Sequence, residues 1–278
     1  MWISEKQFPR EGQKGREIMK KTLATILAVL MMAACMAGCG KKDGGSDLEY
    51  IKEKGTMIVG MTEYEPMDYK DENGQWIGFD ADLGNLVAEK LGVKAEFMVL
   101  PDWGQKFTEL DAKNIDVIWN GMTITDEVKN NTSYTKPYAI NAQVVVMNRD
   151  KVADYTDKES LNGLKFAVEN GSAGQACLDD LGITDYAALQ DQPAAILEVK
   201  AGTSDACVVD ITMAMAMTGK GGDFTDLAIG LSLTEEQYGI AFRRGSDMAE
   251  KVNSILDELT ADGTMQAQAD KYNITLAE

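Results

Sequence analysis

The sequence predicts an α/β protein of two lobes, because strand and helix signals alternate along the chain and this alternation starts twice. The first alternating run covers residues 48–141 and the second covers residues 148–233. Such alternation is typical of parallel or mixed sheets that carry helices on both faces. Each run ends in an extended apolar segment and not in a flexible linker, at residues 142–147 and 237–242. We therefore expect two hinge crossings, one into the second lobe and one back, with the final helices completing the first lobe.

The first lobe is expected to begin with a short buried strand at residues 57–61, followed by a tight turn at Asn73-Gly74. A helix should come next, because apolar side chains recur at the spacing of one helical face, at Leu83, Leu86, Val87 and Leu91. The remaining elements expected in this lobe are a strand at 93–100, a helix at 105–112 and a strand at 115–119.

The second lobe repeats the pattern, with a strand at residues 166–169 and a helix after Gly171-Ser172. The elements expected after these are a helix at 193–200, a strand at 206–209 and a helix at 211–217. The C-terminal region should be helical, because one face carries Met248, Val252, Ile255, Leu256 and Leu259, and a shorter helix follows Gly263.

These elements predict a discontinuous domain organisation. Lobe 1 should comprise residues 48–141 and 238–278, and lobe 2 should comprise residues 142–237 with the hinge strands. Ligands of open α/β sheets bind beyond the carboxyl ends of the strands. We therefore expect a ligand cleft between the lobes that closes by hinge motion.

Composition excludes several classes of function. The chain has 278 residues, a formal net charge of -18 and no histidine. Nucleic-acid binding is not expected, because phosphate contacts need clustered Lys and Arg. Catalytic dyads or triads that contain His and zinc sites built on imidazole are absent. We expect no cofactor and no metal, and a monomer.

Residues 1–38 resemble a secretory signal peptide. Lys20 and Lys21 precede an apolar run at residues 23–34 that ends in small residues. The run is close to the length of a membrane span, which is the alternative interpretation. Met36-Ala37-Gly38-Cys39 resembles a bacterial lipobox, in which Cys39 becomes the lipidated first residue; Cys35 is a weaker second candidate.

Residues 39–47, which include a Gly/Ser-rich stretch, then form a lipidated tether between the membrane and the globular part. A complete signal peptide begins at Met19, so we expect translation to start there.

Four further stretches resemble the bacterial extracellular solute-binding proteins of family 3, which serve ABC importers of polar amino acids. They are Tyr64-Glu65-Pro66-Met67 with Gly78-Phe79-Asp80-Ala81-Asp82-Leu83, the run from Ile115 to Thr125, Glu169-Asn170-Gly171-Ser172-Ala173-Gly174, and the run from Asp205 to Asp210. The resemblance covers about residues 48–275. It implies the type II periplasmic-binding-protein-like fold, in which the ligand cleft lies between two lobes.

The resemblance also implies a set of ligand-binding residues. Asp210 should receive a ligand ammonium group, although an Asp there also suits a helix N-cap. Gly171, Ser172 and Ala173 should present N–H groups to an anionic ligand group, unless they form an ordinary capped turn. The other expected contacts include Asn120, Gly121 and Thr123, which otherwise form a plain loop. Tyr64 and Trp103 should line the cleft with their aromatic rings, unless the rings pack in the core, and Glu63 lies beside Tyr64.

One position departs from the family pattern. The family has an Arg three residues after the Thr at 125, and that Arg binds the α-carboxylate of the ligand. Val128 occupies this position here, and Lys129 follows. Either Lys129 and the helix N-terminus hold the carboxylate, or the ligand is not a standard α-amino acid.

The expected function is solute binding and delivery to an ABC importer, by a protein held at the outer face of the membrane through its lipid. Two other functions remain open. One is an enzyme of the same fold, similar to a cyclohexadienyl dehydratase, and the other is a ligand-sensing lobe for a separate receptor. Cys177 and Cys207 could form a disulfide or stay as thiols, since the sequence does not give their separation.

Overall fold

The computed structural model describes residues 45–278. The predicted signal peptide, the start at Met19, the lipid site at Cys39 and most of the tether lie outside the described residues. No helix in the described part is long and apolar enough to cross a membrane.

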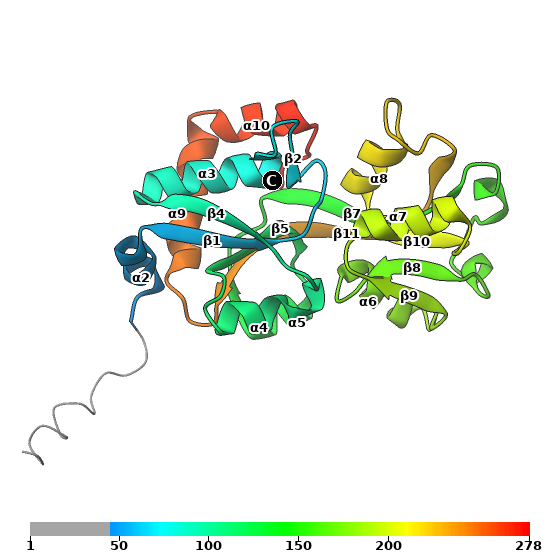
Figure 1. The fold of residues 1–278 in the computed structure, drawn as a ribbon, viewed down its shortest axis with the longest axis horizontal. Coiled ribbons are helices and arrows are strands. Elements are labelled where there is room, and N and C mark those ends of the chain that lie inside the picture. The colour runs from blue at the N-terminus through cyan, green and yellow to red at the C-terminus, as the bar shows by residue number, and fades with distance from the viewer. Residues whose placement is uncertain (1–44) are drawn as a thin grey trace, which may run out of the picture. The chain divides into compact units, whose positions relative to one another are not determined.

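The expected α/β fold is confirmed. Figure 1 shows a sheet with helices on both sides, and its main strand order is β4-β1-β5-β11-β7-β10-β8-β9, with β6 paired to β11. The strands are β1 (Thr56–Met61), β4 (Lys94–Val99), β5 (Val117–Thr123), β6 (Thr132–Tyr134), β7 (Ala139–Asn148), β8 (Phe166–Glu169), β9 (Tyr186–Leu189), β10 (Ala206–Asp210) and β11 (Leu227–Arg243). A separate small hairpin joins β2 (Tyr69–Lys70) to β3 (Trp76–Ile77) around the predicted Asn73-Gly74 turn.

Helices cover both faces of the sheet. Before β5 and around it lie α2 (Asp47–Lys54), α3 (Phe79–Leu91), α4 (Lys106–Asp111) and α5 (Asp126–Asn131). The middle of the chain adds α6 (Ala173–Asp180), α7 (Gln192–Ala201) and α8 (Ile211–Thr218), and the C-terminal region adds α9 (Met248–Ala261) and α10 (Thr264–Tyr272). The five predicted apolar positions of α9 are all buried, which confirms its predicted face.

The two extended crossings are β7 and β11, which pair antiparallel along most of their length. The C-terminal part of β11 pairs with β5, and the other edge of β7 pairs with β10. These two strands therefore connect the half of the sheet that contains β1, β4 and β5, called lobe 1 here, to the half that contains β8, β9 and β10, called lobe 2 (Figure 1). The predicted boundaries at residues 141/142 and 237/238 fall inside these strands and stay a prediction.

The carboxyl ends of three strands converge where β7 and β11 pass between the lobes. The register of β7 on β11 shifts near Ser232, close to this point. Strand β5 ends at Thr123, β8 ends at Glu169 and β10 ends at Asp210. This topology positions polar side chains from distant parts of the sequence around one location, which is where ligands bind in open α/β sheets.

Candidate ligand-binding site

A small inner cavity lies at the carboxyl ends of these strands. Its volume is about 30 Å³, which exceeds the roughly 10–15 Å³ that a cavity needs to hold one water molecule. The residues that line it are Trp103, Asn120, Gly121, Met122, Thr123, Gln143, Glu169, Ser172, Ala173, Gln192 and Asp210. In this conformation the inner cavity therefore has room for a single small polar group, such as an ammonium.

Asp210 is the most extensively hydrogen-bonded carboxylate of the inner cavity. Asn141 Nδ2 donates to its Oδ1 at 2.6 Å, Gln192 Nε2 donates to its Oδ2 at 2.6 Å, and Gln143 Nε2 also donates to Oδ1. Asp210 occupies the N-cap position of α8, but its carboxylate accepts no hydrogen bond from that helix. Because these side-chain amides orient the carboxylate, the plain N-cap alternative does not describe its role in this fold.

Glu236, from β11, lies beside Asp210 and shares its donors. Its Oε1 accepts from Asn141 Nδ2 at 2.6 Å, from Gln143 Nε2 at 2.7 Å and from Thr123 Oγ1 at 2.7 Å. Burial raises the pKa of Asp210 to about 7, and the negative charge of Glu236 adds to this rise. A cation would stabilise the ionised form of Asp210, which burial and the neighbouring charge of Glu236 oppose.

Glu169 is the second carboxyl group that lines the inner cavity. Burial raises the pKa of Glu169 to about 8, so it is largely protonated at neutral pH. Its Oε1 lies 3.1 Å from Thr62 Oγ1, and that hydroxyl lies 2.9 Å from Asn120 Oδ1. Since a hydroxyl has a single proton, it donates to one of the two oxygens only. A protonated Glu169 satisfies the contact by donating to Thr62 Oγ1 while Thr62 donates to Asn120.

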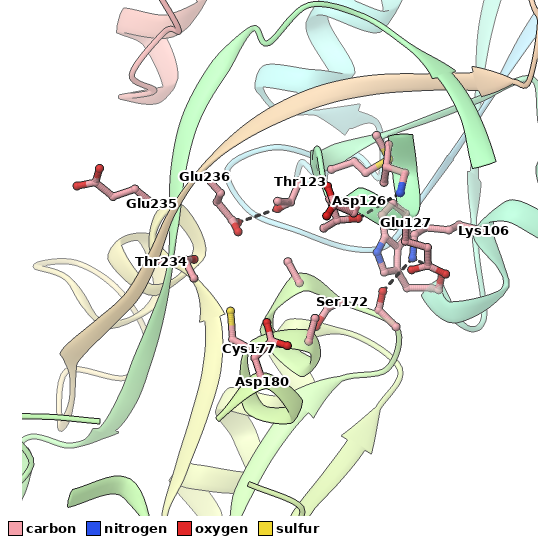
Figure 2. Close-up of a pocket in the computed structure, with 17 residues that line it drawn as sticks. Lys106, Thr123, Asp126, Glu127, Ser172, Cys177, Asp180, Thr234, Glu235 and Glu236 are labelled. Carbon is pink, nitrogen blue, oxygen red and sulfur yellow. Dashed lines mark hydrogen bonds between the residues drawn. The ribbon is translucent and has the colours of Figure 1, made fainter. Parts of the chain in front are cut away.

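A larger outer cavity of about 450 Å³ adjoins the inner one. Both are lined by Trp103, Met122, Thr123, Ser172 and Ala173. Figure 2 shows acidic side chains around the outer cavity, namely Asp126, Glu127, Asp180, Glu235 and Glu236. Of the described residues that line the outer cavity, Lys106 alone is basic. The combined cavities therefore have the volume for a small polar molecule and a strongly negative lining.

Most of the predicted site residues come together. Trp103, Asn120, Gly121, Thr123, Ser172, Ala173 and Asp210 line the inner cavity, and Gly171 lines the outer one. Ser172 also caps α6, since its Oγ accepts from Gln175 N–H at 3.1 Å. Val128, which replaces the Arg of the family pattern, lies on the wall of the outer cavity.

Three predicted residues lie elsewhere. The Tyr64 ring is buried in the core, and its hydroxyl forms a 2.6 Å hydrogen bond with the hydroxyl of Tyr238 in place of an open cleft position. Glu63 lines a different cavity together with Tyr69 and Met213. Lys129 is half exposed and forms an ion pair with Asp126 at 3.0 Å, so it does not take the position of the absent Arg.

The sequence did not predict a site role for Glu236, Glu169, Lys106 or the three amides that hold Asp210. The position of Glu169 at the end of a predicted buried strand was the one signal available for it. Cys177 and Cys207 are free thiols in the structure, so no disulfide joins them. Cys177 lies on the wall of the outer cavity, and burial raises the pKa of its thiol to about 11.

An α/β fold with two lobes, two connecting strands and a polar cleft at the strand ends defines a solute-binding protein of the type II periplasmic-binding-protein class. The chain belongs to the bacterial extracellular solute-binding proteins, family 3, whose family model matches residues 57–275.

Relatives and solved structures agree with this assignment. The chain is 29% identical over 248 residues to the L-cystine-binding protein TcyJ of Escherichia coli (strain K12), which covers 87% of this chain and 92% of the relative. It is 31% identical over 238 residues to the L-arginine-binding protein of Pseudomonas aeruginosa, with 80% and 89% covered.

Two solved structures share the fold. A mutant of ArgBP from T. maritima matches with a TM-score of 0.76 and 34% identity, over 81% of this chain and 98% of that chain. The ancestral amino acid-binding protein AncCDT-1, a precursor of cyclohexadienyl dehydratase, matches with a TM-score of 0.75 and 31% identity, over 82% and 99%.

Proposed function

We propose that this protein captures an amino acid or an amino-acid derivative in the cleft and delivers it to an ABC importer. The observation that carries the proposal is the arrangement of Asp210, a buried carboxylate that three side-chain amides orient toward a cavity of ammonium size. Relatives named for binding L-cystine and L-arginine support the same ligand class.

In this proposal the ligand ammonium enters the inner cavity and forms a charge-assisted pair with Asp210. Glu236 adds negative charge on the hinge strand, and Thr123 is fixed there by its hydrogen bond to Glu236. Trp103 supplies an apolar wall that both cavities share. Ligand contacts to both lobes favour the closed form over the open form, and the closed form docks on the permease.

The proposal includes the location of the protein. We propose that a signal peptide directs it out of the cytoplasm, with translation starting at Met19, and that a lipid on Cys39 holds it at the membrane as a monomer. Metabolic labelling with a radioactive or alkyne-tagged fatty acid tests this directly. The wild type should be labelled and the Cys39→Ala variant should not, and equal labelling of both would contradict lipidation at this residue.

A second candidate function is catalysis on the same fold, and one observation favours it. The protonated Glu169 is an acid positioned at the inner cavity, and an acid of this pKa can donate a proton at neutral pH. The similarity to AncCDT-1 motivates prephenate as the test substrate. Turnover of prephenate that Glu169→Gln abolishes would establish this second function.

A thermal-shift screen of the purified protein separates these functions. The panel contains the standard amino acids, L-cystine, opines, polyamines and prephenate. We expect one group of amino acids or derivatives to raise the melting temperature and to be recovered chemically unchanged. A panel in which only polyamines stabilise the protein, or in which prephenate is converted, would contradict the proposed ligand class.

A further inference from the structure

Lys106 is a buried cation at the boundary between the lobes. It begins α4 in lobe 1 and lines the outer cavity, yet it is only 4% exposed. Its Nζ donates to the backbone oxygen of Gly171 in lobe 2 at 2.9 Å and lies 3.4 Å from the backbone oxygen of Trp103. The ammonium also lies 5.1 Å from the centre of the Trp103 ring and 4.8 Å from the centre of the Phe107 ring.

The charge of Lys106 has no ion-pair partner among residues 45–278. Burial lowers the pKa of Lys106, while the more distant charges of Glu127 and Asp102 oppose this effect. A buried ammonium that only carbonyl groups and aromatic rings contact is costly, because these neutral groups replace its hydration only in part. An ammonium has three N–H donors, and the two carbonyl oxygens use at most two of them.

Lys106 lies at a different place on the cavity wall from the carboxyl groups of Asp210 and Glu236, although Glu127 lies close to it. Figure 2 shows Lys106 near Ser172 at one side of the outer cavity and Glu236 at another. Ser172 and Ala173, at the first turn of α6, line the same cavity and contribute the positive end of a helix dipole. Asp210 and Glu236 lie together near the inner cavity.

We propose that Lys106 is the residue that binds the carboxylate of the ligand, through the ammonium donor that no protein group uses. This inference rests on the proposed function, since it requires a ligand that carries both an ammonium and a carboxylate group. The ligand carboxylate neutralises the charge of Lys106 and lies beside the first turn of α6.

The same residue connects ligand binding to closure of the lobes. Lys106 reaches Gly171 from lobe 1, and nearby Asn170 Nδ2 donates to Asp102 Oδ1 across the same boundary at 2.7 Å. A Cβ atom on Gly171 would lie 2.5 Å from Gly104 Cα, so only a residue without a side chain permits this approach. A carboxylate between Lys106 and α6 therefore contacts both lobes, and it stabilises the arrangement in which they meet.

The test compares ligands that differ only in the carboxylate. Isothermal titration calorimetry measures the binding of L-arginine against agmatine, and of L-cystine against cystamine, to the full wild-type chain and to Lys106→Met. We expect the variant to lose about 10- to 100-fold in affinity for the amino acid that binds wild type, the range for a hydrogen bond to a charged group. The affinity for the matching amine should change by less than about threefold.

Two further variants control for folding and for the contact to Gly171. Lys136→Met removes an exposed cation whose ion pair with Asp257 lies on the surface, and it should leave both affinities unchanged. Lys106→Gln keeps a donor for Gly171 but carries no charge, so it should lose the preference for the carboxylate as Met does.

Equal losses for the amino acid and its amine, or full discrimination in Lys106→Gln, would overturn the role of Lys106 while leaving the proposed function intact. A folded wild-type protein, judged by circular dichroism, that binds none of the four ligands would overturn this inference and count against the proposed function too.

Discussion

Replacing Asp210 by Ala should abolish most of the ligand affinity without unfolding the protein. Asp210 is 4% exposed and accepts hydrogen bonds from Asn141, Gln143 and Gln192. Asn141 and Gln143 keep Glu236 as an acceptor in the variant, so only the Gln192 amide loses its partner. An unsatisfied buried donor costs about 1–3 kcal/mol.

This loss is offset in part, because the substitution also removes a carboxyl group whose ionisation burial and Glu236 oppose. The net change in the free energy of unfolding of the ligand-free protein should therefore stay within about 2 kcal/mol. The loss of a buried charge-assisted contact to a ligand costs more, about 2–5 kcal/mol, which corresponds to about a 30- to 5000-fold weaker Kd.

The assay combines urea denaturation of the ligand-free protein with the ligand-induced change in Tm. Asp226→Ala is the matched control, because Asp226 is exposed and pairs with Lys200 on the surface. The control should keep the ligand-induced rise in Tm and Asp210→Ala should lose it. A folded Asp210→Ala protein that binds the ligand at wild-type affinity would refute the assignment of Asp210 as the ammonium site.

Three other outcomes follow from the geometry of the cleft. Glu236→Gln should lower the pKa of Asp210 from about 7, because a neighbouring negative charge is removed. An NMR titration of the carboxyl groups that shows no decrease would contradict the interaction between Glu236 and Asp210. The free energy of unfolding of the ligand-free protein should fall as the pH rises from about 4 to 8 and then level off. Folding raises the pKa of Asp210 to about 7 and of Glu169 to about 8, so the folded state holds protons that the unfolded chain has released. Denaturation curves collected across this range should show the decline, and a rise would contradict it. Gly171→Ala should hinder closure of the lobes, because the new Cβ would meet Gly104 Cα at 2.5 Å and the φ of +69° is strained for Ala. Small-angle scattering with ligand should show a more open protein than wild type, and identical profiles would contradict the contact.

The sequence predicted the fold because its strands and helices carry strong local patterns. It underestimated β11, which runs from Leu227 to Arg243, because polar residues around Thr234 interrupt the apolar pattern of that strand. Helix α5 escaped prediction since Val128 is its single buried residue. Tertiary pairing with β7, and not local propensity, makes the polar part of β11 extended.

The site could be predicted in part for a related reason. Asp210 directly follows one predicted strand and Ser172 comes three residues after another, so their positions near strand ends were visible in the sequence. The hydrogen bond between Gln143 and Asp210 joins residues that are 67 positions apart, and no local pattern reveals such a pair. Tyr64 was placed in the cleft by resemblance, but a buried tyrosine and a stacking one have the same local sequence. Its burial and its hydrogen bond to Tyr238 distinguish the two.

Solute binding by this protein is tested most directly by isothermal titration calorimetry of the full chain with the ligand that the screen identifies, followed by mass spectrometry of the recovered ligand. We expect saturable binding of one amino acid or derivative per chain and recovery of the ligand without chemical change. Binding should weaken as the pH drops below about 7, because Asp210 takes up a proton. Affinity that is independent of pH between 5 and 8, or a ligand returned in altered form, would contradict these expectations.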